Sequence, residues 1–161
     1  MTGTFGFSYV GLIFLACLFI PNILYARVPP TDAVKFEENK VLLACERAGQ
    51  ALCTVTVLIF SDFNVHSVDP RLLWLGGALV LMLLYLICWG RYFAGKHVTR
   101  DFLRPFLGLP LPLAVLPVAA ALLLAVYGRV IWLGIAGVIL GVGHIGITAQ
   151  HWAALKKVER P

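Results

Sequence analysis

LLWLGGALVLMLLYLICW, residues 72–89, is an apolar run without a single charged side chain. An α-helix needs about 20 residues, at about 1.5 Å each, to cross roughly 30 Å of hydrocarbon. The strands of a membrane barrel are shorter, about 10 residues, and alternate apolar with polar side chains. The run is therefore predicted to be a membrane-spanning helix.

Four more runs of similar length and character accompany it. The predicted spans are Phe5–Ala26, Val41–Phe60, Leu72–Trp89, Phe106–Tyr127 and Val130–Ala149. Hydrophobic residues make up 60% of the chain and charged residues 13%, against about 25% charged residues in soluble domains. The sequence predicts an all-α fold, a bundle of five transmembrane helices that forms one integral membrane domain over residues 1–161.

The predicted span 106–127 is the least regular because it contains Pro110, Pro112 and Pro117. A proline lacks the backbone N–H group and kinks or ends a helix. One alternative is that the first half of this run is re-entrant, which would leave four full spans. Five spans is the prediction.

Lysine and arginine are distributed unevenly between the two sides of this arrangement. Ten of the thirteen fall on one side, Arg71 and Arg129 fall on the other, and Arg47 lies within a span. Because basic residues concentrate in cytoplasmic loops, the N-terminus is predicted to be outside and the C-terminus in the cytoplasm. The net charge of +5 thus reflects topology, and no nucleic-acid partner is expected. The ten residues are Arg27, Lys35, Lys40, Arg91, Lys96, Arg100, Arg104, Lys156, Lys157 and Arg160.

No known catalytic or metal-binding motif is present, so a cofactor cannot be named and no metal site is predicted. The H-E-x-x-H and G-x-S-x-G motifs are missing, as is a glycine loop for phosphate. Asp62, His66 and Asp69 fall together between two spans, and we interpret them as a polar turn. The four cysteines lie in predicted spans and are interpreted as packing groups. They are Cys17, Cys45, Cys53 and Cys88.

Two charged residues, Glu46 and Arg47, stand side by side within the predicted span 41–60. If the membrane began only after Arg47, the rest of this span would cover about 20 Å, which is too short. Both groups are therefore predicted to lie within the cytoplasmic leaflet. One interpretation is structural, with Arg47 reaching the lipid phosphates and Glu46 either protonated or bonded to a neighbouring helix. The other is a binding site.

The span 130–149 and the residues just after it carry small and polar residues at alternating spacings of three and four. These are Gly134, Gly137, Gly141, His144, Thr148 and His151. Such a stripe lets a neighbouring helix approach closely, so the three glycines are predicted to be helix-packing residues. We expect the stripe to face the span 41–60, with His144 within hydrogen-bond reach of Glu46 or Gln50.

Several polar residues are predicted at a similar depth under the cytoplasmic headgroups, where they would form a ligand-binding cluster. They are Asn22, Glu46, Arg47, Gln50, Arg91, His144 and His151. The first hypothesis is a non-enzymatic protein that binds membrane lipids or serves as a transporter or complex subunit, as a homo-oligomer or in a larger membrane complex. The alternative is a membrane-embedded enzyme acting on a lipid or isoprenoid. There Glu46 or His144 would be the general base, and Arg47 or Arg91 would hold a phosphate.

Three segments carry a resemblance to known proteins. LFIPN (18–22), ENKVLLACERAGQ (38–50) and IFSDFN (59–64) resemble signatures of a family of small, uncharacterised multi-pass bacterial membrane proteins. The resemblance covers mainly the first two predicted spans. It implies a location in the bacterial inner membrane and adds no activity.

Overall fold

The computed structural model describes residues 2–33 and 37–158, and the chain folds into helices there. The α-helices are α1 (Tyr9–Arg27), α2 (Lys40–Ile59), α3 (Leu72–Phe93), α4 (Thr99–Leu103), α5 (Pro112–Gly128) and α6 (Ile131–Val158), with a 3₁₀ turn η1 (Ser61–Phe63) after α2. Four of them, α1, α2, α3 and α6, are long and apolar enough to cross a membrane. The prediction of an all-α, multi-pass membrane protein is confirmed at this level.

The helix expected at 106–127 begins later than predicted. Residues 106–109 form a tight turn in which Phe106 and Leu109 exchange two backbone hydrogen bonds of 3.1 and 2.9 Å. Leu111, at φ 51°, then leads into a helix that starts at Pro112. The first helical position suits proline because its missing N–H group would have no partner there. As a result α5 has 17 residues and is shorter than the four candidate spans.

The other helix ends also differ from the sequence-based limits. The first helix begins at Tyr9, since residues 4–8 pair with the end of α2 through bonds such as Gly6 N–H to Ile59 O (2.9 Å). Ser8 caps this helix by accepting a bond from the N–H of Gly11 at 2.8 Å. At the other end of the chain, α6 continues to Val158. Its last turns are polar, so apolar character alone placed its end too early.

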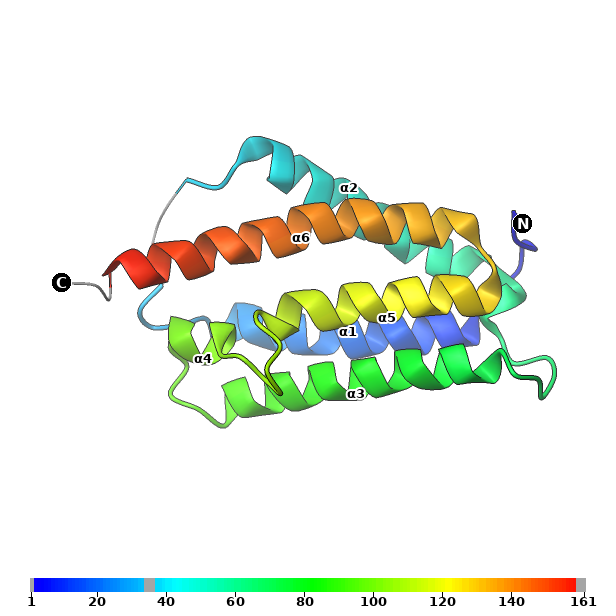
Figure 1. Cartoon of the computed structure of the whole chain (residues 1–161), viewed down its shortest axis with the longest axis horizontal. Coiled ribbons are helices and arrows are strands. Elements are labelled where there is room, and N and C mark those ends of the chain that lie inside the picture. The colour runs from blue at the N-terminus through cyan, green and yellow to red at the C-terminus, as the bar shows by residue number, and fades with distance from the viewer. Residues whose placement is uncertain (1, 34–36, 159–161) are drawn as a thin grey trace.

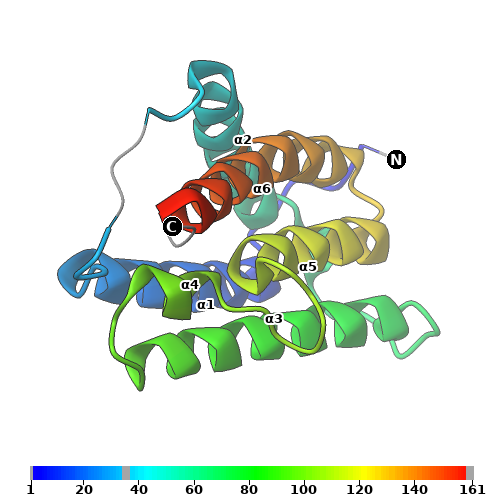
Figure 2. The ribbon, with the colours of Figure 1, turned by 60° about the vertical axis from the view of Figure 1, so that its left-hand side comes forward.

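The long helices run alternately in opposite directions, and the two chain ends lie at opposite ends of the bundle (Figure 1). The N-terminal segment, the α2–α3 connection and the α5–α6 turn gather at one end, called here the N-terminal end. The opposite end, with α4 and the end of α6, is called the α4 end. Two groups are visible when the molecule is turned: α1, α3 and α5 lie together, and α2 packs mainly on α6 (Figure 2).

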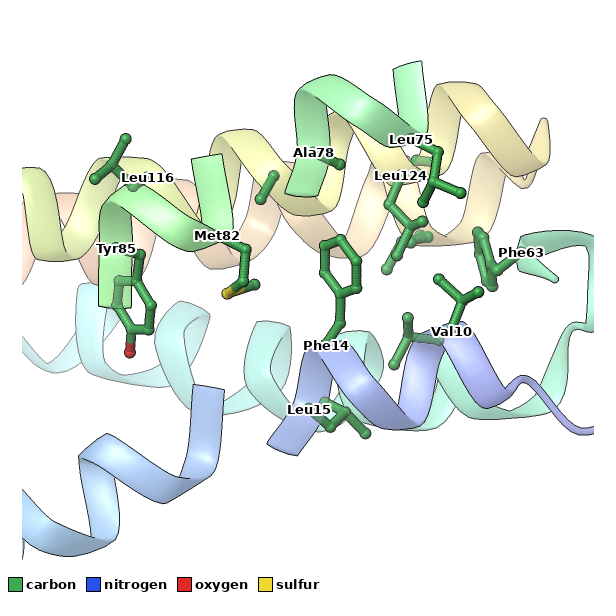
Figure 3. Packing of buried hydrophobic residues seen from close by; sticks show 14 of the residues in the cluster. Val10, Phe14, Leu15, Phe63, Leu75, Ala78, Met82, Tyr85, Leu116 and Leu124 are labelled. Carbon is green, nitrogen blue, oxygen red and sulfur yellow. The ribbon is translucent and has the colours of Figure 1, made fainter. Parts of the chain in front are cut away.

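The core joins α1, α3 and α5. Phe14 of α1 points between α3 and α5, where it lies near Met82, Ala78 and Leu124 (Figure 3). Phe14 is 3% exposed and Leu124 is 1% exposed. Lipid tails are as apolar as these side chains, so close packing and interhelical hydrogen bonds hold a membrane bundle together.

Candidate functional site

The two helices α2 and α6 touch backbone to backbone at two glycines. A Cβ atom built on Gly49 of α2 would lie 2.5 Å from the Cα atom of Leu140. One built on Gly143 of α6 would lie 2.6 Å from the Cα atom of Glu46. Real Cβ atoms do not approach that closely, so only glycine fits at either position. The predicted pairing of these two helices is confirmed.

The glycines that were expected to make this contact face another helix. The nearest neighbours of a Cβ atom at Gly137 and Gly141 are Leu122 and Val118 of α5, at 3.0 and 3.1 Å. Gly134 also faces α5, with the Cβ atom of Ala125 at 3.9 Å. Gly137 and Gly141 thus approach α5 closely, whereas Gly134 makes only an ordinary contact with it, and the predicted partner of these three glycines was wrong. The glycines that face α2 are Gly143 and Gly146, which lie on a different side of α6.

The close approach of the helices places Glu46 against His144. The Glu46 Oε1 and His144 Nδ1 atoms are 2.5 Å apart, which confirms the predicted contact. The side chains are 16% and 29% exposed, so each is partly accessible. An ionised carboxylate only accepts hydrogen bonds, and Nδ1 therefore carries the proton when Glu46 is ionised. This leaves Nε2 of His144 as the ring atom for a second partner.

A second pair of the same kind lies closer to the α4 end. His151 Nε2 is 3.3 Å from Oε1 of Glu38, just before α2 begins. Next to it, the backbone N–H of Asn39 donates to Oε1 of Gln150 at 3.3 Å. Glu38 was not among the predicted site residues because it precedes the apolar run. Glu38 lies eight residues before Glu46, and His151 lies seven residues after His144. On two antiparallel helices these separations are nearly equal, and this spacing is the signal that could have identified Glu38.

The remaining members of the expected cluster lie elsewhere. Asn22 donates to the hydroxyl of Tyr85 at 2.9 Å, between α1 and α3. The guanidinium of Arg91 lies 4.9 Å from the ring centre of Phe106. The structure thus brings Glu46 together with His144 and does not join these two residues to that pair.

Arg47 and Gln50 lie on α2 next to the pair and are exposed. Within residues 2–33 and 37–158, Arg47 has no ion-pair partner. The backbone carbonyl of Gln50 accepts a bond from the hydroxyl of Thr54 at 2.7 Å. Against the part of the chain that the structure describes, Arg47 therefore offers a guanidinium whose donors are available, one residue from a carboxylate that is already bonded.

Comparison of the chain with protein-family models, curated proteins and solved structures gave no match. The resemblance noted in the sequence is thus supported only in its general part, a helical membrane protein with several spans. The described residues contain no group of three or more His, Cys, Asp or Glu side chains arranged to hold a metal ion.

Proposed function

We propose that the chain crosses a bacterial inner membrane five times, with the short helix α5 as a span in addition to α1, α2, α3 and α6. The alternating directions of the long helices support this, because an odd number of crossings places the chain ends on opposite sides (Figure 1). With about 26 Å of length, α5 nearly covers the hydrocarbon. The predicted excess of basic residues at the α4 end supports a cytoplasmic location for that end.

We further propose that the protein binds an anionic lipid headgroup at α2, with Arg47 as the phosphate ligand and the Glu46–His144 pair as its neighbour. The observation that carries this is an exposed guanidinium on a membrane-spanning helix without an ion-pair partner in the described chain. A charge at the bilayer centre costs about 2.5 to 3.5 kcal/mol on insertion scales, and less nearer the headgroups. A lipid phosphate offsets that cost through charge-assisted hydrogen bonds.

The depth of these residues agrees with a headgroup site. Glu46 is the seventh residue of α2, so it lies about 9 Å along the helix axis from Lys40. The stem of an arginine is long enough to carry its charged end from this depth toward the interface. The protein would use the same face of α2 to bind the headgroup whether it acts alone or as part of a larger membrane complex.

The Glu46–His144 contact favours a second candidate, an enzyme that acts on a lipid or isoprenoid. A histidine held by a carboxylate through Nδ1 has its Nε2 atom available to take a proton from a substrate. Arg47 would then bind the phosphate of that substrate. The two candidates differ in the effect of Glu46→Gln: this change abolishes turnover in an enzyme and leaves lipid retention unchanged in a binding protein.

The test is the lipid that remains with the purified full-length chain, measured by native mass spectrometry. We expect Arg47→Leu to lose most bound anionic lipid and Arg47→Lys to keep part of it, since charge persists without the planar donor pair. Arg100→Leu, at an exposed arginine of α4, is the matched control and should leave retention unchanged. Equal retention in Arg47→Leu and the parent would refute headgroup binding at this residue.

A further inference from the structure

A polar cleft opens at the N-terminal end of the bundle, far from the Glu46–His144 pair. Its volume is about 550 Å³, and its walls come from residues 2–4, the α2–α3 connection and the α5–α6 turn. These three segments are distant in the sequence and meet at one end of the bundle (Figure 1). The lining consists mostly of polar side chains and glycine. Such a lining suits a small polar molecule better than an apolar one.

Hydrogen bonds fix the walls of the cleft. The backbone N–H of Thr4 donates to Oδ2 of Asp62 at 2.5 Å, and the N–H of Ser61 donates to the carbonyl of Thr4 at 3.1 Å. Asn64 ties the α2–α3 connection to the start of α1 and to the end of α5: its Oδ1 accepts from the N–H of Tyr9 at 2.9 Å, and its backbone carbonyl accepts from the hydroxyl of Tyr127 at 3.2 Å. A site fixed before binding spends little free energy on ordering.

Among the described residues, two carboxylates and two guanidiniums line this cleft, and one carboxylate is paired with one guanidinium. Asp69 and Arg71 are joined by an ion pair of 2.5 Å, and hydrogen bonds from Arg71 lower the pKa of Asp69 to about 2. The carboxylate of Asp62 accepts only from Thr4 within the described chain. Arg129 has no ion-pair partner there. One negative and one positive group therefore remain for a ligand.

The backbone at Arg129 adds a second observation. This residue follows α5 in the left-handed region, at φ 53°, where its N–H group caps the helix through the carbonyls of Ala125 and Val126. Glycine or asparagine usually occupies this position, because other side chains are strained there. Arg71 and Arg129 are also the only lysine or arginine residues among those described at this end of the bundle, and both line the cleft.

We propose that the cleft binds a small zwitterion, with the anionic group on Arg129 and the ammonium group on Asp62. An anion alone would leave Asp62 without a counter-charge, and a cation alone would leave Arg129 without one. Phosphoethanolamine has both groups and is small enough to enter the cleft, either as a free solute or as the headgroup of phosphatidylethanolamine.

The first experiment is titration calorimetry on the full-length, lipid-depleted chain in detergent, with phosphoethanolamine, inorganic phosphate and ethanolamine as separate probes. We expect phosphoethanolamine to bind about tenfold or more tightly than either single-charge probe. Arg129→Gly and Asp62→Asn should each weaken it about tenfold or more, whereas Arg104→Ala, at the opposite end, should not. Because glycine suits the left-handed backbone, Arg129→Gly should melt no lower than the parent.

A second experiment distinguishes free phosphoethanolamine from the headgroup of phosphatidylethanolamine as the ligand. Native mass spectrometry of the chain from phosphatidylethanolamine nanodiscs shows whether the lipid is retained. Retention that falls in Arg129→Gly identifies the headgroup as the ligand, and unchanged retention together with calorimetric binding identifies the free solute. The proposal is overturned if inorganic phosphate binds as tightly as phosphoethanolamine, or if Arg129→Gly binds like the parent.

Discussion

Replacing Gly143 with alanine tests the backbone contact on which the Glu46–His144 pair depends. The added Cβ atom would lie 2.6 Å from the Cα atom of Glu46, whereas carbon atoms in contact are normally about 3.5 Å apart. The neighbour is backbone, so no side chain can rotate away, and the two helices must separate by about 1 Å. Overpacking of this kind costs about 1 to 3 kcal/mol.

Gly134→Ala is the matched control on the same helix. Its Cβ atom would meet the Cβ atom of Ala125 at 3.9 Å, an ordinary contact. Both variants gain the same intrinsic helix propensity, about 1 kcal/mol. The difference between their free energies of unfolding therefore measures the steric overlap of the added Cβ atom with the backbone of α2. We expect Gly143→Ala to be less stable than Gly134→Ala by about 1 to 3 kcal/mol.

Reversible unfolding in mixed micelles measures this difference. Crosslinking gives a second readout, because the side chain of Leu42 lies 3.0 Å from a Cβ atom at Gly146. The pair Leu42→Cys and Gly146→Cys, in a chain without the native cysteines, should form a disulfide, and adding Gly143→Ala should lower its yield. Equal stabilities for the two alanine variants, with an unchanged yield, would refute the close contact.

Two further predictions concern topology and pH. A reporter fused after Pro161 should be cytoplasmic and one inserted near Asn64 external; if accessibility labelling finds both on one side, the number of spans is even and α5 does not cross. The second concerns Asp69, whose pKa is lowered to about 2 by Arg71. A lowered folded-state pKa stabilises the fold above the unfolded value of about 3.9, and the contribution is lost as the pH falls toward 2. Asp69→Asn should therefore reduce the fall in the free energy of unfolding between about pH 4 and 2. An unchanged pH dependence in this variant would show that the ion pair does not persist in solution.

The helices were predictable because hydrocarbon requires long apolar segments with internally bonded backbones. Their ends were less predictable, because polar turns extend a helix beyond the membrane and apolar loops resemble helices. Residues 106–111 are apolar but form a turn, since Leu107 and Leu111 both have positive φ angles of 51°. No pattern in the apolar residues indicates that conformation.

The contact between Glu46 and His144 was predictable from depth and chemistry, but the expected glycine face was not. Helical periodicity shows which residues share a face of α6, and it does not show which neighbour that face meets. The 3-and-4 spacing of Gly134, Gly137 and Gly141 places them on one face of α6, and that face meets α5. The backbone contact with α2 depends on Gly143, which stands outside that series. Asn22 and Arg91 were included by depth alone, and depth does not determine the position around the bundle.

The unequal lengths of α5 and α6 affect the lipid around the protein. Arg129 and Val130 join the end of α5 to the start of α6, so these two helix ends lie at the same surface. The helices contain 17 and 28 residues, respectively. Their lengths are about 26 and 42 Å, one below and one above the roughly 30 Å of hydrocarbon. Adjusting bilayer thickness costs a fraction of a kcal/mol per Å. The last turns of α6 are polar and extend beyond the hydrocarbon, so the mismatch falls on α5. With α5 as the proposed span, the bilayer is expected to be thinner beside this helix.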